Sequence, residues 1–500
     1  MTRNTLLFTF LLTALSARLA AQSYWQQEVN YTIDVSLNES ARTLDGHIRI
    51  QYTNHSPDTL SFIWIHCWPN AYKTDRTAFS EQLLENGRTD FYFSDKEKKG
   101  YINRLDFHVD GRAARTEDHP LHIDIVKVIL PSPLPPGGTI LLTTPFHEKL
   151  PFPFSREGYA AGTYQVTQWY PQPAVYDSRG WHEMPYLDQG EFYGEFGDYD
   201  VQITLPSAYV VGATGSLQTS SELEAYKHTG KAPASTEKTK TLQYHATNVH
   251  DFAWFADKHF HVACDTLQLP SGKQIDLFSY YTSKAKPDWQ HSIGYMKNAL
   301  RFRSLLIGDY PAPAASIVAV KTGSGDGMEY PGIAAVNAQL TGKALDLVIG
   351  HELGHNWFYG ALGTDERRYP WMDEGMNTYY DQRYAALEQP SPSKKPHANN
   401  DWLQRKIPQD LDTIFLSTLI KEKKDQPIST SSEAFTVYNY GLIPYNKAAA
   451  WMCLLQDSLG QKRFDTAMRA YYNEWAFKHP GPPDFRTVRS EEHTSELQSP

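Results

Sequence analysis

The sequence predicts a protein of two main domains, a β-rich domain followed by a mainly helical α+β domain. The chain has 500 residues, which is too long for one ordinary domain. Up to about Cys264, apolar and polar residues alternate with the period of a β-strand. After about Ile275, apolar residues recur at the spacing of a helix instead. We therefore expect domains at residues 22–265 and 266–488.

The β-rich half contains runs in which every second residue is apolar, as in a half-buried strand. Turn-forming residues separate these runs. The polar stretch 220–240 is expected to form a long exposed loop. The expected strands are residues 31–37, 47–52, 59–65, 139–146 and 201–205.

The second half alternates a short apolar run, at residues 316–320, with longer amphipathic segments. The short run is predicted to be a strand. The longer segments are predicted helices, and glycines follow two of them directly, at Gly363 and Gly460. These expected helices are residues 289–300, 345–362, 373–387, 448–459 and 464–475.

The first 21 residues have the features of a secretory signal peptide. Arg3 precedes an apolar run at residues 6–15, and small residues follow before Gln22. The run is too short to span a bilayer, and no later stretch is long and apolar enough to do so. We therefore expect export to the periplasm or the medium, with no membrane span.

The last residues, 489–500, show no apolar period and closely resemble a translated sequencing-adapter read-through. We expect this segment to be non-native and the chain to be truncated; an ordinary disordered tail is the alternative. The three cysteines, Cys67, Cys264 and Cys453, are scattered and odd in number, which favours buried free thiols. The net charge of −10 argues against nucleic acid as a partner.

A candidate metal site is present in His351-Glu352-Leu-Gly-His355, which has the H-E-x-x-H pattern. Residues four apart lie on one face of a helix, so the two imidazoles can bind one cation. Glu374 follows His355 after eighteen intervening residues, in another predicted helix. Two histidines and one carboxylate leave a position for water, as in catalytic zinc sites. The alternative is a hydrogen-bonded pair of core histidines.

These motifs resemble a known family of enzymes. His-Glu-Leu-Gly-His-Asn-Trp-Phe at 351–358, Trp-Met-Asp-Glu-Gly at 371–375 and Tyr379 are similar to the aminopeptidase N and leukotriene hydrolase family of gluzincin zinc metallopeptidases. The resemblance runs from about Tyr24 to about Val488. It implies a thermolysin-like catalytic domain, one Zn²⁺ per chain, and peptides as substrates. The family's helical C-terminal domain would not fit before Val488 and is expected to be missing.

The resemblance also implies catalytic roles for two residues. Glu352 would be the general base, accepting a proton from the attacking water. Tyr445, in Tyr-Asn-Lys-Ala at 445–448, matches the family's tyrosine that stabilises the oxyanion. Tyr438 and Tyr440 lie nearby in the sequence and are competing candidates.

Substrate binding is implied for four further residues. Asp-Gly-Met-Glu-Tyr at 326–330 is similar to the family's G-x-M-E-N motif, so Glu329 would hold the substrate's free amine, flanked by Gly327 and Met328. Gln168 matches a polar contact that the family supplies from its N-terminal domain.

Two departures from the family pattern leave the specificity open. Tyr170 stands where the family has a second glutamate, and Tyr330 stands where it has asparagine. The leading hypothesis is an aminopeptidase that releases N-terminal residues. A zinc endopeptidase of other specificity and a non-catalytic peptide-binding relative are the alternatives.

Overall fold

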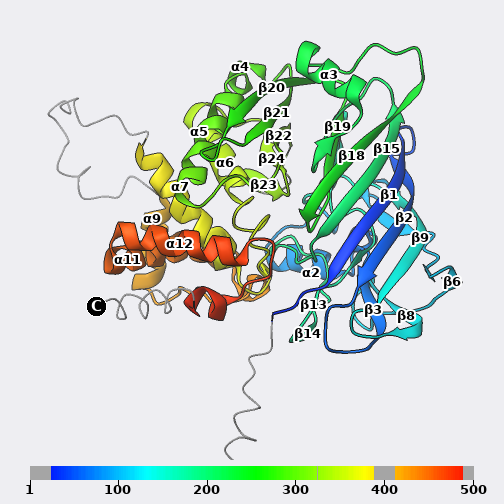
Figure 1. The fold of residues 1–500 in the computed structure, drawn as a ribbon, viewed down its shortest axis with the longest axis horizontal. Coiled ribbons are helices and arrows are strands. Elements are labelled where there is room, and N and C mark those ends of the chain that lie inside the picture. The colour runs from blue at the N-terminus through cyan, green and yellow to red at the C-terminus, as the bar shows by residue number, and fades with distance from the viewer. Residues whose placement is uncertain (1–23, 322, 324, 388–410, 488–500) are drawn as a thin grey trace, which may run out of the picture.

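A computed structural model describes residues 24–321, 323, 325–387 and 411–487 of the chain. The strands of the first half, coloured blue to green, lie at the right of Figure 1. The helices of the second half, coloured green to red, lie at the left. The expected signal peptide (1–21) and the expected non-native tail (489–500) fall outside the described residues.

The first domain is built on a nine-stranded sheet in the order β17-β18-β15-β1-β2-β9-β5-β6, with β4 also paired to β9. Its pairs are antiparallel except β1 with β15, which run parallel. Alternate residues of each long strand are buried, as the sequence pattern predicts. The strands are β1 (Glu28–Asn38), β2 (Thr43–Thr53), β4 (Tyr101–Asn103), β5 (His108–Val109), β6 (Arg112–Ala113), β9 (Thr139–Lys149), β15 (Gly197–Pro206), β17 (Ser216–Leu217) and β18 (Thr239–Val249).

Smaller sheets and short helices complete this domain. One sheet has the order β10-β11-β19-β16 and another β12-β3-β8-β7, and β13 pairs with β14. Their strands are β3 (Leu60–His66), β7 (Arg115–Asp118), β8 (Ile125–Leu134), β10 (Gly158–Ala160), β11 (Thr163–Val166), β12 (Gln172–Pro173), β13 (Tyr176–Asp177), β14 (Gly180–Trp181), β16 (Val210–Ala213) and β19 (Trp254–Asp257). The helices are η1 (Trp68–Tyr72), α2 (Ala78–Glu85), η2 (Lys96–Lys98) and α3 (Ser220–Thr229).

The second domain combines a mixed five-stranded sheet, in the order β20-β21-β22-β24-β23, with packed helices. The strands are β20 (Phe260–Gln268), β21 (Gln274–Thr282), β22 (Ala314–Val320), β23 (Gly327–Tyr330) and β24 (Ile333–Asn337). The helical elements are α4 (Lys286–Trp289), α5 (Ser292–Leu306), α6 (Gly342–Gly354), η3 (Trp371–Gly375), α7 (Met376–Leu387), α9 (Leu411–Lys421), η4 (Ser432–Ala434), α10 (Val437–Tyr440), η5 (Ile443–Lys447), α11 (Ala448–Leu459) and α12 (Gln461–Trp475). Within the described residues, no separate helical domain follows α12.

Three expectations from the sequence need correction. Residues 220–229 form helix α3 rather than a loop, because Tyr226 is buried and Gly230 ends the helix in the left-handed conformation. The helix expected at 345–362 ends at Gly354, and His355 caps it. The expected domain boundary at 265/266 falls inside β20, so the change from one sheet to the next comes before Phe260.

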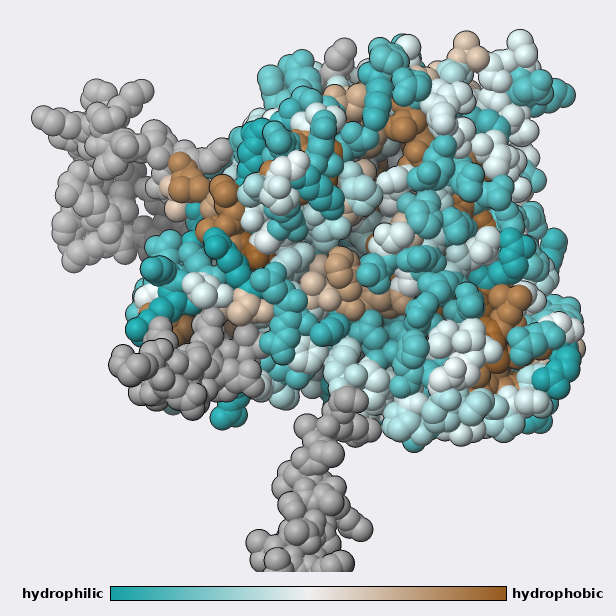
Figure 2. All heavy atoms as spheres, in the orientation of Figure 1, coloured by the Kyte–Doolittle hydropathy of each residue, from teal (hydrophilic) through white to brown (hydrophobic). Residues whose placement is uncertain are grey.

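The visible surface is mostly hydrophilic, with scattered groups of apolar side chains, one of them at the left of Figure 2. Among exposed large apolar residues, Leu387 ends α7, and Phe415 and Ile420 belong to α9. The helices that the structure describes include none with the length and apolar character needed to cross a bilayer.

The first domain buries a pair of carboxyl groups that have no cationic partner among the described residues. Glu148 on β9 is fully buried, and Glu157 is 1% exposed. Neither oxygen of Glu148, nor Oε1 of Glu157, has a hydrogen-bond partner. Burial and the charge of Glu157 hold the pKa of Glu148 well above its usual range. Burial raises the pKa of Glu157 to about 8, with Glu148 opposing the shift. The folded pair therefore retains a proton at neutral pH.

This pair makes stability depend on pH. Above the usual glutamate pKa of 4.5 the unfolded chain releases the proton that the folded chain keeps, so stability falls as pH rises toward about 8. We expect Glu157→Gln, which needs no proton, to raise Tm by several degrees at about pH 9 and by little at about pH 5. Scanning calorimetry at both pH values tests this. The exposed Glu237→Gln is the control, and an equal gain at both pH values would contradict the prediction.

Candidate metal centre

Helix α6 brings two imidazoles together on one face. Leu345, Ile349 and Leu353 are fully buried and fix the opposite face of α6 in the domain core. His351 and His355 follow one turn apart, and their Nε2 atoms lie 3.1 Å apart. The lone pairs of the two Nε2 atoms can therefore be directed at a single ion.

Glu374 completes the set from η3, a single π-helical turn that leads into α7. Its Oε2 atom lies 3.3 Å from Nε2 of His351 and 3.4 Å from Nε2 of His355. This oxygen is buried and has no hydrogen-bond donor. Two nitrogens and an orphaned carboxylate oxygen, all within 4.8 Å of one another, fit a zinc ion with a position left for water.

A carboxylate faces each imidazole and fixes its orientation; Asp373 is buried and Asp381 is partly buried. The Nδ1 atom of His351 lies 2.6 Å from Asp381 Oδ2, and the Nδ1 atom of His355 lies 2.5 Å from Asp373 Oδ1. Burial alone would lower the pKa of each histidine, but the facing carboxylates raise both pKa values overall. With the Nδ1 proton held by a carboxylate, each Nε2 is left to bind metal.

The sequence did not identify Asp373, Asp381 or Arg303 as residues of the metal site. The buried Arg303 of α5 donates to Asp381 Oδ1 at 2.5 Å and to the carbonyl of Gly350 at 3.0 Å. A signal for Asp381 was present, since it lies seven residues after Glu374, two helical turns along the same face. No comparable signal identified Arg303.

Glu352 lies beside the metal set on the edge toward β23. It is 5% exposed, its Oε2 atom has no partner, and burial raises its pKa to about 7 against the opposing charges of the histidines. A β-carbon on Gly327 would collide with the carboxyl group of Glu352. The glycine expected to bind substrate thus also makes room for the expected base.

The competing tyrosines have different environments. Tyr445 lies in η5, a second π-helical turn, and its hydroxyl donates to Glu374 Oε1 at 2.6 Å. Tyr438 is 79% exposed. The Tyr440 ring lies 6.5 Å from the Tyr445 ring, and its buried hydroxyl has no partner. Of the three hydroxyls, that of Tyr445 is the one bonded to a residue of the metal set.

The expected amine anchor, Glu329, lies on the edge strand β23. It is 5% exposed, and its Oε1 atom has no hydrogen-bond partner. Burial raises its pKa well above the usual value, with His355 opposing. Gly327, two residues before Glu329 on the same strand, lies against Glu352, so the strand that carries the expected anchor also borders the expected base.

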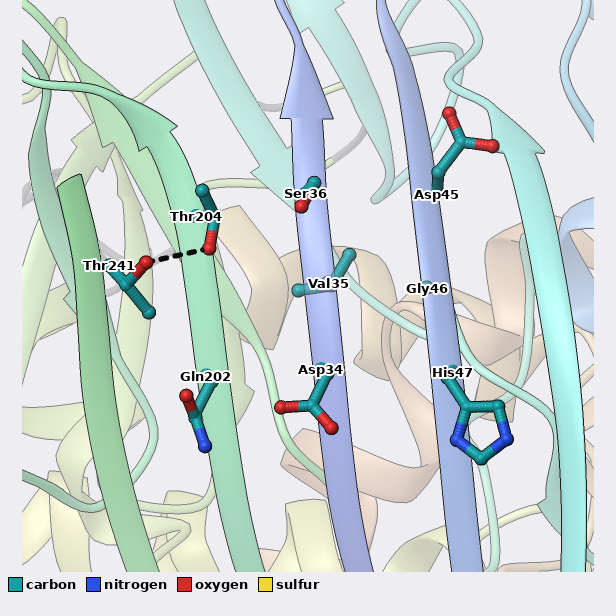
Figure 3. Close-up of a pocket in the computed structure, with 9 residues that line it drawn as sticks. All are labelled: Asp34, Val35, Ser36, Asp45, Gly46, His47, Gln202, Thr204 and Thr241. Atoms are coloured by element: carbon teal, nitrogen blue, oxygen red, sulfur yellow. Dashed lines mark hydrogen bonds between the residues drawn. The ribbon is translucent and has the colours of Figure 1, made fainter. Parts of the chain in front are cut away.

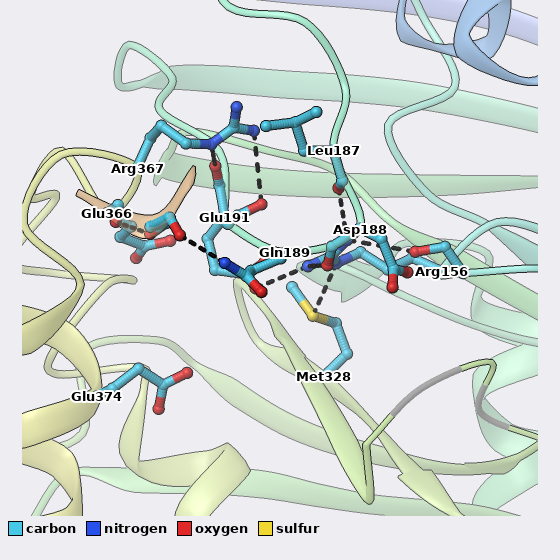
Figure 4. A network of polar contacts seen from close by, with 12 residues as sticks. Arg156, Leu187, Asp188, Gln189, Glu191, Met328, Glu366, Arg367 and Glu374 are labelled. Atoms are coloured by element: carbon cyan, nitrogen blue, oxygen red, sulfur yellow. Dashed lines mark hydrogen bonds and ion pairs between the residues drawn. The ribbon is translucent and has the colours of Figure 1, made fainter. Parts of the chain in front are cut away.

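The first domain holds the neighbouring residue of this strand in place. Arg156 donates to Met328 Sδ at 3.2 Å and to Glu191 Oε1 at 2.7 Å. Figure 4 shows this network, in which Arg156 also reaches the carbonyls of Leu187 and Asp188. Segments far apart in the sequence therefore meet at β23.

Gln168 and Tyr170 belong to the core of the first domain. Gln168 has a φ of 53° and donates to Asp251 Oδ2 at 3.0 Å, while its Oε1 atom stays without a partner. Tyr170 donates to Asp251 Oδ1 at 2.9 Å and lies 3.0 Å from the Tyr199 hydroxyl. The tyrosine that replaces the family's glutamate is thus a buried hydrogen-bonding group within the first domain.

A separate depression lies on the outer face of the nine-stranded sheet of the first domain, and it contains none of the residues of the metal set. It is lined by the exposed polar side chains of β1, β2, β15 and β18 shown in Figure 3, where Thr204 and Thr241 are joined by a 2.8 Å hydrogen bond. Its side chains form no cluster of metal-ligating groups of the kind found around His351 and His355.

Comparisons with known proteins agree with this geometry. Residues 294–499 match the model of the peptidase family M1 domain. Aminopeptidase M1-B of Oryza sativa subsp. japonica is 25% identical over 203 residues, covering 38% of this chain and 22% of the relative. Glutamyl aminopeptidase of Sus scrofa is 20% identical over 241 residues, covering 43% of this chain and 23% of the relative. The match thus spans about a quarter or less of these relatives.

The fold is that of zinc metallopeptidases. The M1 zinc metallopeptidase of Deinococcus radiodurans superposes with a TM-score of 0.63 at 16% identity, covering 93% of this chain and 89% of that one. The domain match over residues 294–499 agrees with the resemblance to the aminopeptidase N and leukotriene hydrolase family, and the structural likeness shows a common fold.

The two π-helical turns touch so closely that Gly375 has no room for a side chain. An added β-carbon would lie 2.5 Å from Ala448 Cβ and 2.7 Å from the carbonyl of Pro444. Gly375→Ala should therefore displace Glu374 and weaken zinc binding by about tenfold or more. Competition with a chromophoric chelator measures this. Gly294→Ala, where the β-carbon meets open space, is the matched control. Unchanged zinc affinity in the Gly375 variant would contradict the prediction.

Proposed function

We propose that this protein is a zinc-dependent peptidase that releases residues from the free N-terminus of peptides. The observation that carries the proposal is the convergence of His351, His355 and Glu374, with the buried Glu352 and Glu329 beside them; Glu329 has an oxygen within 4.8 Å of ligand atoms of His355 and Glu374. An anchor for an ammonium group near a hydrolytic centre selects the first residue of a chain. The names of the M1 relatives, which are aminopeptidases, support the same activity.

The proposed mechanism assigns each step to a side chain. Zinc at this site would lower the pKa of a water molecule to about 7 and polarise the scissile carbonyl. Glu352 accepts the water proton and passes it to the leaving amine. The Tyr445 hydroxyl turns from Glu374 to donate to the developing oxyanion. Glu329 pairs with the α-ammonium group and holds the first peptide bond in place.

A zinc endopeptidase remains the second candidate, because Tyr170 occupies the place of the family's second glutamate and bonds to Asp251. The two functions differ in their need for a free terminus. An aminopeptidase cleaves a free peptide and leaves its N-acetylated form intact. Equal cleavage of the two forms would favour the endopeptidase.

We expect Glu352→Gln to lower kcat by about a thousandfold or more, because the amide cannot accept the proton of the attacking water. The variant should still bind one zinc per chain, since the three ligands are untouched. Metal content by mass spectrometry and hydrolysis of a fluorogenic aminoacyl substrate measure the two effects. Activity near that of the wild type would exclude Glu352 as the base.

We expect Glu329→Gln to weaken kcat/KM for free peptides by about tenfold to a hundredfold, the value of one charge-assisted hydrogen bond. Any residual cleavage of the N-acetylated peptide should be unchanged, because that substrate has no ammonium group to lose. Comparing both peptides in both proteins gives the answer. An equal loss on the blocked peptide would show that Glu329 does not serve as the amine anchor.

We also propose that the protein is exported, on the strength of the apolar run at residues 6–15 and the small residues before Gln22. Expression of the full chain in a Gram-negative host should give a periplasmic product that begins at or near Gln22. A product that stays in the cytoplasm with Met1 in place would contradict export.

A further inference from the structure

Glu366 is a buried carboxylate that no part of the proposed mechanism uses. It lies on the segment between α6 and η3 and is 1% exposed, and neither of its carboxylate oxygens has a hydrogen-bond partner. Its backbone is held firmly, because Ser432 donates its hydroxyl to the Glu366 carbonyl at 3.1 Å and its amide to the Arg367 carbonyl at 2.8 Å. A rigid, buried and unpaired carboxylate is costly unless something completes it.

Hydrogen bonds connect the segment that carries Glu366 to strand β23: Arg367 donates to the carbonyl of Glu191, whose side chain binds Arg156, and Arg156 also donates to Met328 Sδ. The charges that act on Glu366 are those of Asp373, Glu329 and Glu191, which raise its pKa, and that of His355, which lowers it; burial raises it most. Figure 4 shows Glu366 beside Glu191 and Arg367, with Glu374 on the same side of the view. The carboxylate therefore belongs to the region that contains the amine anchor and a metal ligand.

The nearby arginines are committed to other groups. Arg156 pairs with Glu191 at 2.7 Å. Arg367, although next in the chain, donates to the carbonyls of Pro185 and Glu191 at 3.3 and 3.1 Å and lies 3.9 Å from Glu433. Within the described residues, no lysine or arginine forms an ion pair with Glu366. Burial favours the protonated, neutral form of Glu366 in the free chain. A cation that stabilises its charged form would therefore have to come from outside the chain.

We propose that Glu366 selects peptides whose first residue has a cationic side chain, lysine or arginine. The inference rests on the proposed function. In the proposed function, Glu329 on β23 pairs with the α-ammonium group of the substrate. Glu366 comes from a different segment, between α6 and η3. It pairs with a second positive charge, carried by the side chain of the substrate's first residue. Lysine and arginine are the first residues that carry two such charges.

The experiment compares aminoacyl-7-amido-4-methylcoumarin substrates of arginine, lysine, leucine and methionine on the zinc-loaded enzyme and on Glu366→Gln. The amide keeps the shape of the side chain and removes its charge. The expected loss in kcat/KM is about tenfold to a hundredfold for arginine and lysine, as for one charge-assisted hydrogen bond. Leucine and methionine should change by less than about threefold or gain slightly, because burying a neutral amide costs less than burying a charge.

Glu433→Gln is the matched control, because Glu433 lies near Arg367 but is exposed, at 55% of its side chain. It should leave all four rates unchanged. An equal loss on all four substrates with Glu366→Gln, or no preference of the wild type for arginine and lysine over leucine and methionine, would overturn the inference. Failure of the proposed function is distinct, since it means no zinc-dependent release from any of the four substrates.

Discussion

The two hydrogen bonds between imidazole Nδ1 atoms and the carboxylates of Asp381 and Asp373 determine what this site can do. A neutral histidine binds metal through Nε2 only if its proton stays on Nδ1, and here Asp381 and Asp373 accept a hydrogen bond from Nδ1 at 2.6 and 2.5 Å. They also set the ring planes, which meet at 87° with centroids 4.7 Å apart. Without these acceptors the rings could rotate, and the Nε2 atoms would lose their common target.

The carboxylates themselves depend on deeper packing. Asp381 is matched by Arg303, whose guanidinium group lies in space that only a glycine at position 354 leaves open. Asp373 belongs to the same π-helical turn as Glu374, so one local distortion supplies both a metal ligand and the acceptor behind another ligand. The apolar core under α6 thus fixes the site through two layers of polar contacts.

The sequence was informative where local periodicity and short motifs determine structure. The alternating strands, α11 and the spacing from His351 to Glu374 could be predicted because each depends on neighbours within one or two turns. Helix α3 could not be predicted, because its few apolar residues are interspersed with charged ones. Its burial comes from contacts with β20, which lies later in the chain. The end of α6 at Gly354 could not be predicted either. The residues after His355 are still apolar, because they pack against the rest of the domain.

Long-range contacts account for what motif matching could not supply. Arg156, Glu191 and Glu366 lie in stretches without a recognisable pattern, and they meet only because the first domain packs against β23 and the segment before η3. This packing has a chemical consequence. The second domain alone could hold a metal ion and a base, but Met328 and the segment with Arg367 are fixed by groups from residues 156–191. The candidate metal ligands therefore all come from one domain, whereas the position of β23, which carries the proposed amine anchor Glu329, depends on both.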